Sequence, residues 1–298
     1  MKLIKIATHD GIFHADEVFA LAVLKLSVEL DGDSIEIVRT RDLDLISSCH
    51  MAVDVGGVYD QISHFDHHQK DKPGFRENGI PYASFGLVWK HFGSKLSQNE
   101  EVISDIDSKL VMPIDAVDNG VNISSPVING VREYGISLVF SAISKSLGDD
   151  KTDLAFQKSL EFATLILIGE IKKGELKIEG EKEVTRLIIE QNEPEVLVLE
   201  QYSNWETAVS KFKNIKLVVY PGKEIDRWCI QTARDDVEVF GSDRVSFPKG
   251  WRGLSDAELA LSCGVTDSVF CHSGGFFAVA KTKESAIKMA KIAISEAK

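Results

Sequence analysis

Residues 64–69 form the stretch His64-Phe65-Asp66-His67-His68-Gln69, which contains three imidazoles and one carboxylate within five consecutive positions. Imidazole nitrogens and carboxylate oxygens are common ligands of divalent metal ions in proteins. A histidine-rich loop can also be a plain solvated segment. The stretch therefore points to a metal site only if similar side chains approach it from elsewhere in the chain.

Two other groups of such side chains follow short apolar segments that are typical of strands. The first group contains His9, His14 and Asp16, and the second is Asp54. Parallel strands end at one edge of their sheet, where open α/β proteins bind ligands, so we expect these side chains to converge on one crevice. A carboxylate within an apolar strand is costly unless it is paired or binds metal, although Asp54 could instead cap the turn at Gly56-Gly57.

Two acidic pairs occur near the expected ends of helices. Asp115 and Asp118 are three positions apart and share a helical face near a C-terminus, where carboxylates oppose the helix dipole. This placement favours a ligand role, while the following Asn119-Gly120 would also permit a capping or turn role. Asp16 and Glu17 lie in the first turn of a helix, which suits the dipole in any protein, and for Glu17 we favour this structural interpretation.

The periodicity of the apolar residues predicts an α/β fold with two domains. Strand patterns at 2–6, 35–39, 51–55 and 61–65 alternate with helical patterns, which is typical of a parallel sheet. The helical patterns cover 18–24, 83–92, 100–117, 126–146 and 153–189. Beyond Pro194, strand patterns at 196–199, 215–220 and 227–233 predict a second, mixed sheet. We expect one domain over 1–192, which includes a helical extension, and a smaller α/β domain over 193–298.

The composition indicates a globular protein. The chain has 298 residues, 44% of them hydrophobic and 27% charged, which suffices for a large core in two domains. The formal net charge of −12 argues against a broad basic face that coats duplex nucleic acid, although bound divalent cations would reverse the local sign of an acidic cleft. We expect neither a secretory signal nor a membrane span, since no apolar run approaches roughly 20 residues.

The four cysteines indicate the redox compartment. Cys49, Cys229, Cys263 and Cys271 are scattered without a Cys-x-x-Cys pair, which argues against a zinc ribbon or a disulfide framework. We therefore expect a cytoplasmic protein, or one of an organelle or the nucleus if the source is eukaryotic.

A loop of small residues follows an apolar segment in the last third of the chain. His272-Ser273-Gly274-Gly275 lies between the apolar runs 269–271 and 276–279. Such a loop lets a phosphate or sugar approach backbone N–H groups closely. A Gly-Gly pair is also an ordinary hairpin turn, and the two interpretations carry about equal weight.

The motifs together resemble those of a known superfamily. Four groups resemble the motifs of the DHH phosphoesterase superfamily: His9 with His14 and Asp16, Asp54, Asp66-His67-His68, and Asp115 to Asp118. The longer segments 8–17, 54–60, 65–69, 115–120 and 251–254 resemble the melanocyte-proliferating-gene exonuclease family more closely. The resemblance implies a parallel-sheet DHH phosphoesterase domain, two divalent metal ions and 3'-to-5' exoribonuclease activity. His14 stands where the wider superfamily has an aspartate, and a neutral nitrogen ligand favours Mn²⁺ over Mg²⁺.

The resemblance also implies a role for each motif residue. One metal would be bound by His9, His14 and Asp54, and the other by Asp16, Asp54, His67 and either Asp115 or Asp118, so that Asp54 bridges the two. The catalytic residues would be Asp66, His67 and His68: Asp66 would orient His67, and His68 would contact the substrate phosphate or protonate the leaving oxygen. The second domain would bind substrate through Arg252, His272, Ser273, Gly274 and Gly275.

Two alternatives stay open at this stage. The same centre could serve a phosphatase or pyrophosphatase acting on a small phosphate ester. The chain could also be a metal-stabilised binding module without turnover, since no residue is an unmistakable general acid. The expected partner is single-stranded RNA or a short oligonucleotide, with no membrane, and an oligomer is compatible with the sequence.

Overall fold

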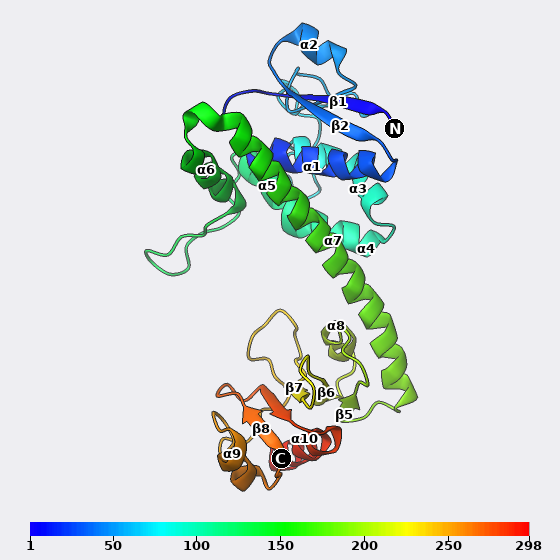
Figure 1. Cartoon of the computed structure of the whole chain (residues 1–298), viewed down its shortest axis with the longest axis vertical. Helices are drawn as coiled ribbons and strands as arrows, with labels where there is room; N and C mark the ends of the chain where they lie inside the picture. Colours follow the sequence, from blue (N-terminus) through cyan, green and yellow to red (C-terminus); the bar gives the residue numbers. More distant parts are fainter. Residues whose placement is uncertain (298) are drawn as a thin grey trace. The chain divides into compact units, whose positions relative to one another are not determined.

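A computed structural model describes residues 1–297 and divides the chain into two compact units, Met1–Glu175 and Leu176–Lys298 (Figure 1). The division falls within helix α7 (Thr152–Glu190), because Val184 and Ile188 of that helix are buried in the core of the second unit. The boundary that the sequence predicts between the catalytic domain and the C-terminal domain, after residue 192, lies just beyond the end of α7 and stays a prediction.

The first unit contains a four-stranded parallel sheet with the order β2-β1-β3-β4. Its strands are β1 (Leu3–Thr8), β2 (Ser34–Arg39), β3 (Met51–Val53) and β4 (His64–Phe65). The predicted parallel sheet is therefore confirmed. Because all four strands run the same way, the residues that follow β1, β3 and β4 meet at one edge.

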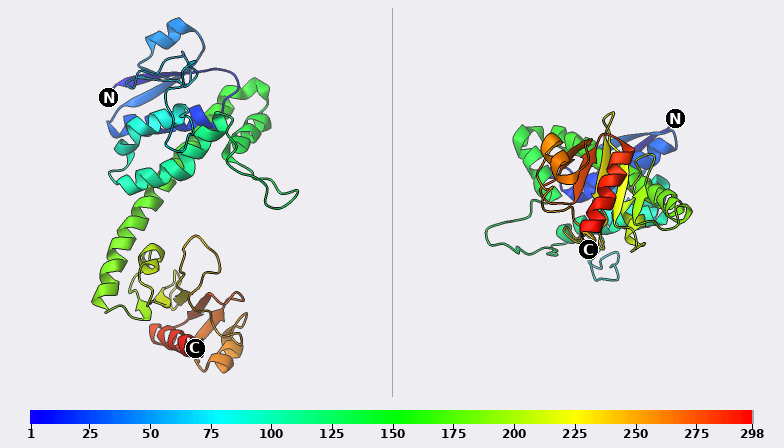
Figure 2. Two further views of the ribbon diagram at one scale, coloured as in Figure 1. Left: turned by 180° about the vertical axis from the view of Figure 1, so that it is seen from behind. Right: turned by 90° about the horizontal axis from the view of Figure 1, so that it is seen from below.

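Helices cover this sheet on both sides. The long apolar run of α1 (Ala15–Leu30) is buried against α3 (Ser84–Leu96), where Phe19 stacks on Phe85 with ring centroids 5.3 Å apart. On the other side, Ile46 of α2 (Leu43–Ser48) packs with Ala7 and Ala52 of the sheet. Figures 1 and 2 show α1 and α3 side by side along the sheet.

The remaining helices of this unit differ in part from the predicted ones. The expected helix 100–117 is observed as α4 (Glu100–Ile106), a π-helical turn (Asp107–Val111) and α5 (Met112–Asp118). The helix predicted over 126–146 is wrong in its first half, since α6 spans only Ile136–Leu147. Pro126, Gly130 and Gly135 interrupt the preceding segment, where proline and glycine disfavour a helix.

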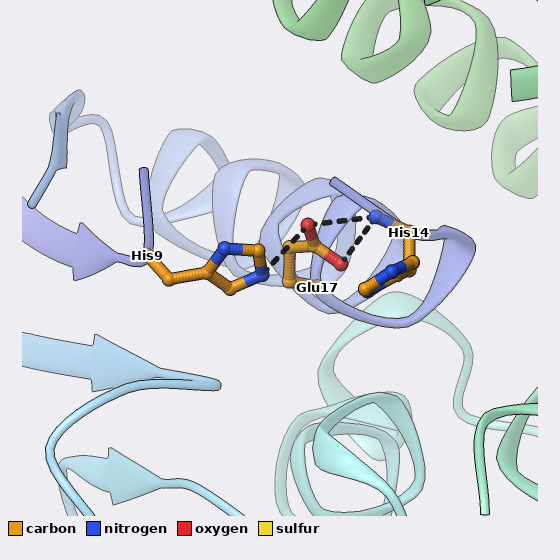
Figure 3. Close-up of side chains that lie close together, drawn as sticks. All are labelled: His9, His14 and Glu17. Atoms are coloured by element: carbon orange, nitrogen blue, oxygen red, sulfur yellow. Dashed lines mark hydrogen bonds and ion pairs between the residues drawn. The ribbon is translucent and has the colours of Figure 1, made fainter. Parts of the chain in front are cut away.

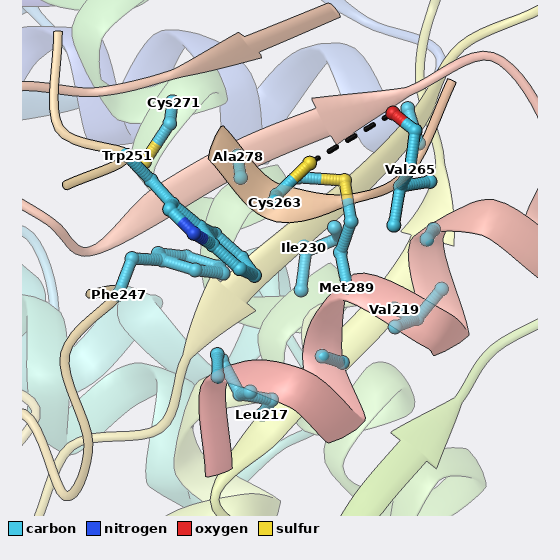
Figure 4. Packing of buried hydrophobic residues seen from close by; sticks show 14 of the residues in the cluster. Leu217, Val219, Ile230, Phe247, Trp251, Cys263, Val265, Cys271, Ala278 and Met289 are labelled. Atoms are coloured by element: carbon cyan, nitrogen blue, oxygen red, sulfur yellow. Dashed lines mark hydrogen bonds between the residues drawn. The ribbon is translucent and has the colours of Figure 1, made fainter. Parts of the chain in front are cut away.

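The second unit contains a mixed sheet, as the sequence predicted, and its strand order is β5-β6-β7-β9-β8. Its elements are β5 (Val196–Val198), α8 (Glu206–Ser210), β6 (Leu217–Pro221), β7 (Trp228–Thr232), α9 (Asp256–Cys263), β8 (Ser268–Cys271), β9 (Phe277–Ala280) and α10 (Lys283–Glu296). Only β5 and β6 pair in parallel. Figure 4 shows one core of this unit, where Trp251, Phe247 and Met289 pack against strand residues such as Ile230. Within residues 1–297, no helix combines the length and apolar character that a membrane crossing requires.

Candidate metal centre

The carboxyl edge of the first sheet collects the side chains that the sequence singled out. His9 follows β1, Asp54 follows β3, and Asp66, His67 and His68 follow β4. The start of α1 adds His14, Asp16 and Glu17, and the end of α5 adds Asp118. Three groups have ligand atoms mutually within 4.8 Å: His9 with His14 and Glu17, Asp54 with His67 and His68, and Asp16 with His67 and Asp118.

Asp54 connects two of these groups. Its Oδ2 lies 3.3 Å from His9 Nε2, and its Oδ1 lies 3.3 Å from His67 Nε2. The carboxylate is buried, and Ser84 Oγ donates to Oδ1 at 3.2 Å. The backbone of Asp54 has a φ of 55°, in the left-handed region, which few residues with a side chain adopt but which aspartate adopts more readily than most. The strand end therefore holds one carboxylate oxygen toward each imidazole.

The buried Glu17 contacts the buried His9 and the exposed His14 (Figure 3). Glu17 Oε1 lies 3.1 Å from His9 Nε2, and the His14 backbone N–H donates to Glu17 Oε1 at 2.8 Å. Burial of Glu17 is complete, which raises the pKa of its carboxyl group. The sequence analysis favoured a dipole role for Glu17 and missed its contact with His9. The spacing of three residues between His14 and Glu17, which is that of a capping box, was the available signal.

Asp16 and Asp118 flank His67 on the other side. His67 Nε2 lies 3.1 Å from Asp118 Oδ2, and burial together with the nearby Asp118 and Asp54 carboxylates raises the pKa of Asp16 well above its usual value. Asp16 accepts hydrogen bonds from the backbone N–H groups of Ser84 and Phe85 at 3.0 and 2.8 Å. The first N–H groups of α3, which have no partner within the helix, thus hold this carboxylate in place.

Asp115 has partners within the protein. Its Oδ2 accepts from Arg76 Nη2 at 2.7 Å and its Oδ1 accepts from the Gly86 N–H at 2.9 Å. Burial raises the pKa of Asp115 to about 7, although Arg76 opposes the shift. A Cβ at Gly86 would lie 2.8 Å from Asp115 Cγ, so only glycine leaves room for this carboxylate. Of the two aspartates left open by the sequence, Asp118 is the one beside His67.

Asp66 contacts His68 rather than His67, whose orientation we expected it to set. Asp66 Oδ1 lies 2.8 Å from His68 Nδ1, and Asp66 Oδ2 accepts from the Gly57 N–H at 2.6 Å. The His68 side chain is 62% exposed and lines a cavity of about 1450 Å³ together with His9, His14, Asp54 and Asp118. The pair therefore presents an oriented imidazole to that cavity.

The donor set fits divalent cations. Both ring nitrogens of the buried His67 lack a hydrogen bond within residues 1–297, although two carboxylates lie within 3.3 Å of Nε2. Burial lowers the pKa values of His9 and His67, but the neighbouring carboxylates outweigh it and raise both to about 10. Closely packed carboxylates and an imidazole without a good hydrogen bond are the arrangement that a cation between them would satisfy.

Apart from His68, the residues predicted to bind substrate lie in the second unit. Arg252 Nε donates to the Phe247 carbonyl at 2.9 Å, and its guanidinium lies over Gly275, whose φ of 73 and missing side chain allow this approach. His272 Nδ1 accepts from the Gly274 N–H at 3.0 Å. The structure thus brings Arg252 and the loop 272–275 together.

The chain is similar to proteins of known families. The family model MYG1_exonuc, described as "Uncharacterised protein family (UPF0160)", matches residues 5–294. The MYG1 protein C694.04c of Schizosaccharomyces pombe is 30% identical over 324 residues, covering 98% of each chain. The MYG1 exonuclease of Mus musculus is 30% identical over 337 residues, covering 98% of this chain and 85% of the mouse protein.

Among solved structures, RecJ from Thermus thermophilus in complex with Mn²⁺ aligns with 98% of this chain, at a TM-score of 0.29 and 12% identity. This chain spans about half of that structure, 52% of its length. The match of the family model over nearly the whole length decides membership: the chain belongs to the MYG1 exonuclease family.

Proposed function

We propose that this protein is a metal-dependent hydrolase that cleaves phosphodiester bonds of nucleic acid, and specifically a 3'-to-5' exoribonuclease. The exonuclease names of its relatives support the general class. The observation that carries the proposal is Asp54, whose two carboxylate oxygens face His9 and His67 separately. A carboxylate in this position can bridge two cations, as two-metal phosphodiesterases require.

We assign ligands to the two proposed ions from the three groups described above. His9, His14 and Glu17 with one oxygen of Asp54 would hold the first, and Asp16, His67 and Asp118 with the other oxygen would hold the second. Two such ions would lower the pKa of a water molecule and neutralise the charge that develops on the phosphate. The mixed nitrogen and oxygen ligands support Mn²⁺ over Mg²⁺.

The protein's own groups would complete the chemistry. His68 lies beside the cavity with its Nδ1 against Asp66, which leaves Nε2 to bind a phosphate oxygen or protonate the leaving group. Asp115 would not bind a metal ion itself but would help to position Asp16, because both carboxylates accept hydrogen bonds from N–H groups at the N-terminus of α3. In the second unit, the Arg252 guanidinium and the loop 272–275 are suited to bind a phosphate of the strand. We also propose that the protein is located in the cytoplasm.

The test is a parallel assay of the purified, Mn²⁺-loaded protein. We expect release of mononucleotides from the 3' end of a 3'-labelled RNA, with slower cleavage of a matched DNA and none of pyrophosphate. Degradation of a 5'-labelled RNA should yield a ladder that shortens progressively, which reports the direction. Hydrolysis of pyrophosphate alone would favour the phosphatase alternative, and absence of any turnover with bound metal would favour a binding module.

A further inference from the structure

A second cavity of about 530 Å³ lies between α5 and the segment that leads into α6. Figure 1 shows this connecting segment as a long loop. Apolar side chains dominate its wall: Leu110, Pro113, Ile114, Val117, Val121, Ile123, Ile136 and Leu138. Its size is within the roughly 300–1000 Å³ of ordinary ligand pockets. None of the proposed chemistry uses this cavity.

The apolar wall is incompletely covered by the protein. Val117, Val121, Ile123 and Leu138 are between 37% and 50% exposed although they face one concave surface. Clustered apolar surface that stays in water is unfavourable, and it commonly marks a place where a ligand binds.

This cavity adjoins the metal-site cavity. Val117 and Ser137 line both of them. Asp118, the residue after Val117, contacts His67. A ligand whose anionic part lies at the carboxyl edge of the sheet can therefore extend an apolar part past Val117 into the second cavity.

We propose that the second cavity binds the nucleobase of the nucleotide whose phosphate lies at the metal centre, an inference that rests on the proposed function. A base offers flat apolar faces for the aliphatic wall and polar edges for the rim, where Asn122, Ser124 and Glu133 lie. Ser137, at the junction, is placed to contact the sugar.

Charge supports a base rather than a second phosphate in this cavity. Among the described residues that line this cavity, Lys109 is the only lysine or arginine. The Lys109 ammonium lies 2.5 Å from Asp105 Oδ2 and 2.7 Å from Glu170 Oε2, so its charge is already compensated. Glu133 adds a carboxylate to the rim, which disfavours an anion further.

The first experiment measures binding without turnover. Affinities of wild type and Ile123→Trp for a nucleoside 5'-monophosphate and for ribose 5-phosphate are determined by calorimetry in Mn²⁺. Tryptophan should fill the cavity and weaken nucleotide binding about tenfold while leaving ribose 5-phosphate unchanged. Val127→Trp is the matched control, because Val127 is 98% exposed on the same segment and does not line the cavity.

A second variant controls for the possibility that the added bulk of Ile123→Trp disturbs the fold. Leu138→Ala removes part of the wall without adding bulk, and it should also weaken the nucleotide selectively while Mn²⁺ affinity stays at the wild-type value. Equal losses for the two ligands, or wild-type nucleotide affinity in both variants, would overturn the inference.

Kinetics then separate this inference from the proposed function. With RNA, Ile123→Trp should raise KM about tenfold for a normal terminal nucleotide and leave an abasic terminus unaffected. If wild type cleaves no nucleic acid at all, the proposed function fails, and the calorimetric comparison still decides whether the cavity recognises a base. Cleavage of RNA with equal KM in all variants would leave the function standing and refute the base pocket.

Discussion

The two units each bury charged side chains, but among the described residues only the second unit supplies its buried charge with a full set of hydrogen bonds. In the second unit, the Arg244 side chain is only 3% exposed, and its guanidinium donates to the carbonyls of Val209, Ser210, Phe212 and Ile215 and to Asp235 Oδ1. In the first unit, Asp16, Asp54 and Asp118 crowd around His67, which lacks a hydrogen bond among the described residues. A buried charge that the chain itself satisfies is structural, whereas a buried imidazole that lacks a hydrogen bond among several carboxylates is the arrangement expected of a ligand site.

The largest expected effect is on activity. Replacing Asp54 by Ala should lower turnover about a thousandfold or more, because both proposed ions lose their shared ligand. In chelator the variant should also unfold at a lower denaturant concentration than metal-free wild type, because His67 and His9 outweigh burial and lower the pKa of Asp54, and the ionised carboxylate therefore stabilises the empty site.

The control for this variant is Asp10→Ala. Asp10 lines the same cavity but is exposed and pairs with Arg41 at 3.2 Å, so turnover should stay near wild type. A loss of stability in Asp54→Ala that is equal with Mn²⁺ and with chelator would instead make Asp54 a structural residue like Arg244.

Arg244→Met should show the reverse behaviour. The change leaves several buried carbonyls without donors and should lower the free energy of unfolding of the second unit by about 3–5 kcal/mol. Denaturation followed by the tryptophan fluorescence of that unit measures it. The loss should be the same with Mn²⁺ and with chelator, and a metal-dependent loss would contradict the separation between the two regions.

Gly86→Ala should have an intermediate effect. The added Cβ would collide with the Asp115 carboxylate and disturb the N-terminus of α3, which should cost about 1–3 kcal/mol of stability. Gly169→Ala in α7 meets no atom within 4 Å among the described residues and should stabilise by about 0.5–1 kcal/mol. Thermal melts of both variants test the contrast, which disappears if Gly86→Ala melts like wild type.

The smallest effect concerns the exposed end of the Arg244 network. Hydrogen bonds from Lys213 and Arg244 lower the pKa of Asp235. A lowered folded-state pKa contributes stability above the unfolded value of about 4, and that contribution is lost as the pH falls through the folded value. Asp235→Asn should therefore be slightly less stable than wild type at pH 7 and equal to it near pH 2. A difference that grows toward acid pH would show that the sign is wrong.

The sequence predicted the parallel sheet and the approach of the strand-end ligands because both depend on local patterns. Strand-like runs that each end in a ligand must converge when the strands are parallel. The partners that stabilise the site are remote: Asp16 accepts from Phe85, 69 positions away, and Asp115 from Arg76, 39 positions away. No periodicity encodes such pairings. Likewise, the helix predicted over 126–146 is wrong over 126–135, because Pro126 and Gly130 disfavour a helix there despite the apolar spacing.

A Mn²⁺ titration of the chelator-treated protein, followed by electron paramagnetic resonance, tests the proposed metal pair directly. We expect two bound ions per chain with a spin-coupled signal, since the Asp54 carboxylate would join them. Asp54→Ala should lose the coupled signal while Asp10→Ala keeps it. A single uncoupled ion in wild type, or an unchanged coupled signal in Asp54→Ala, would contradict a metal pair bridged by Asp54.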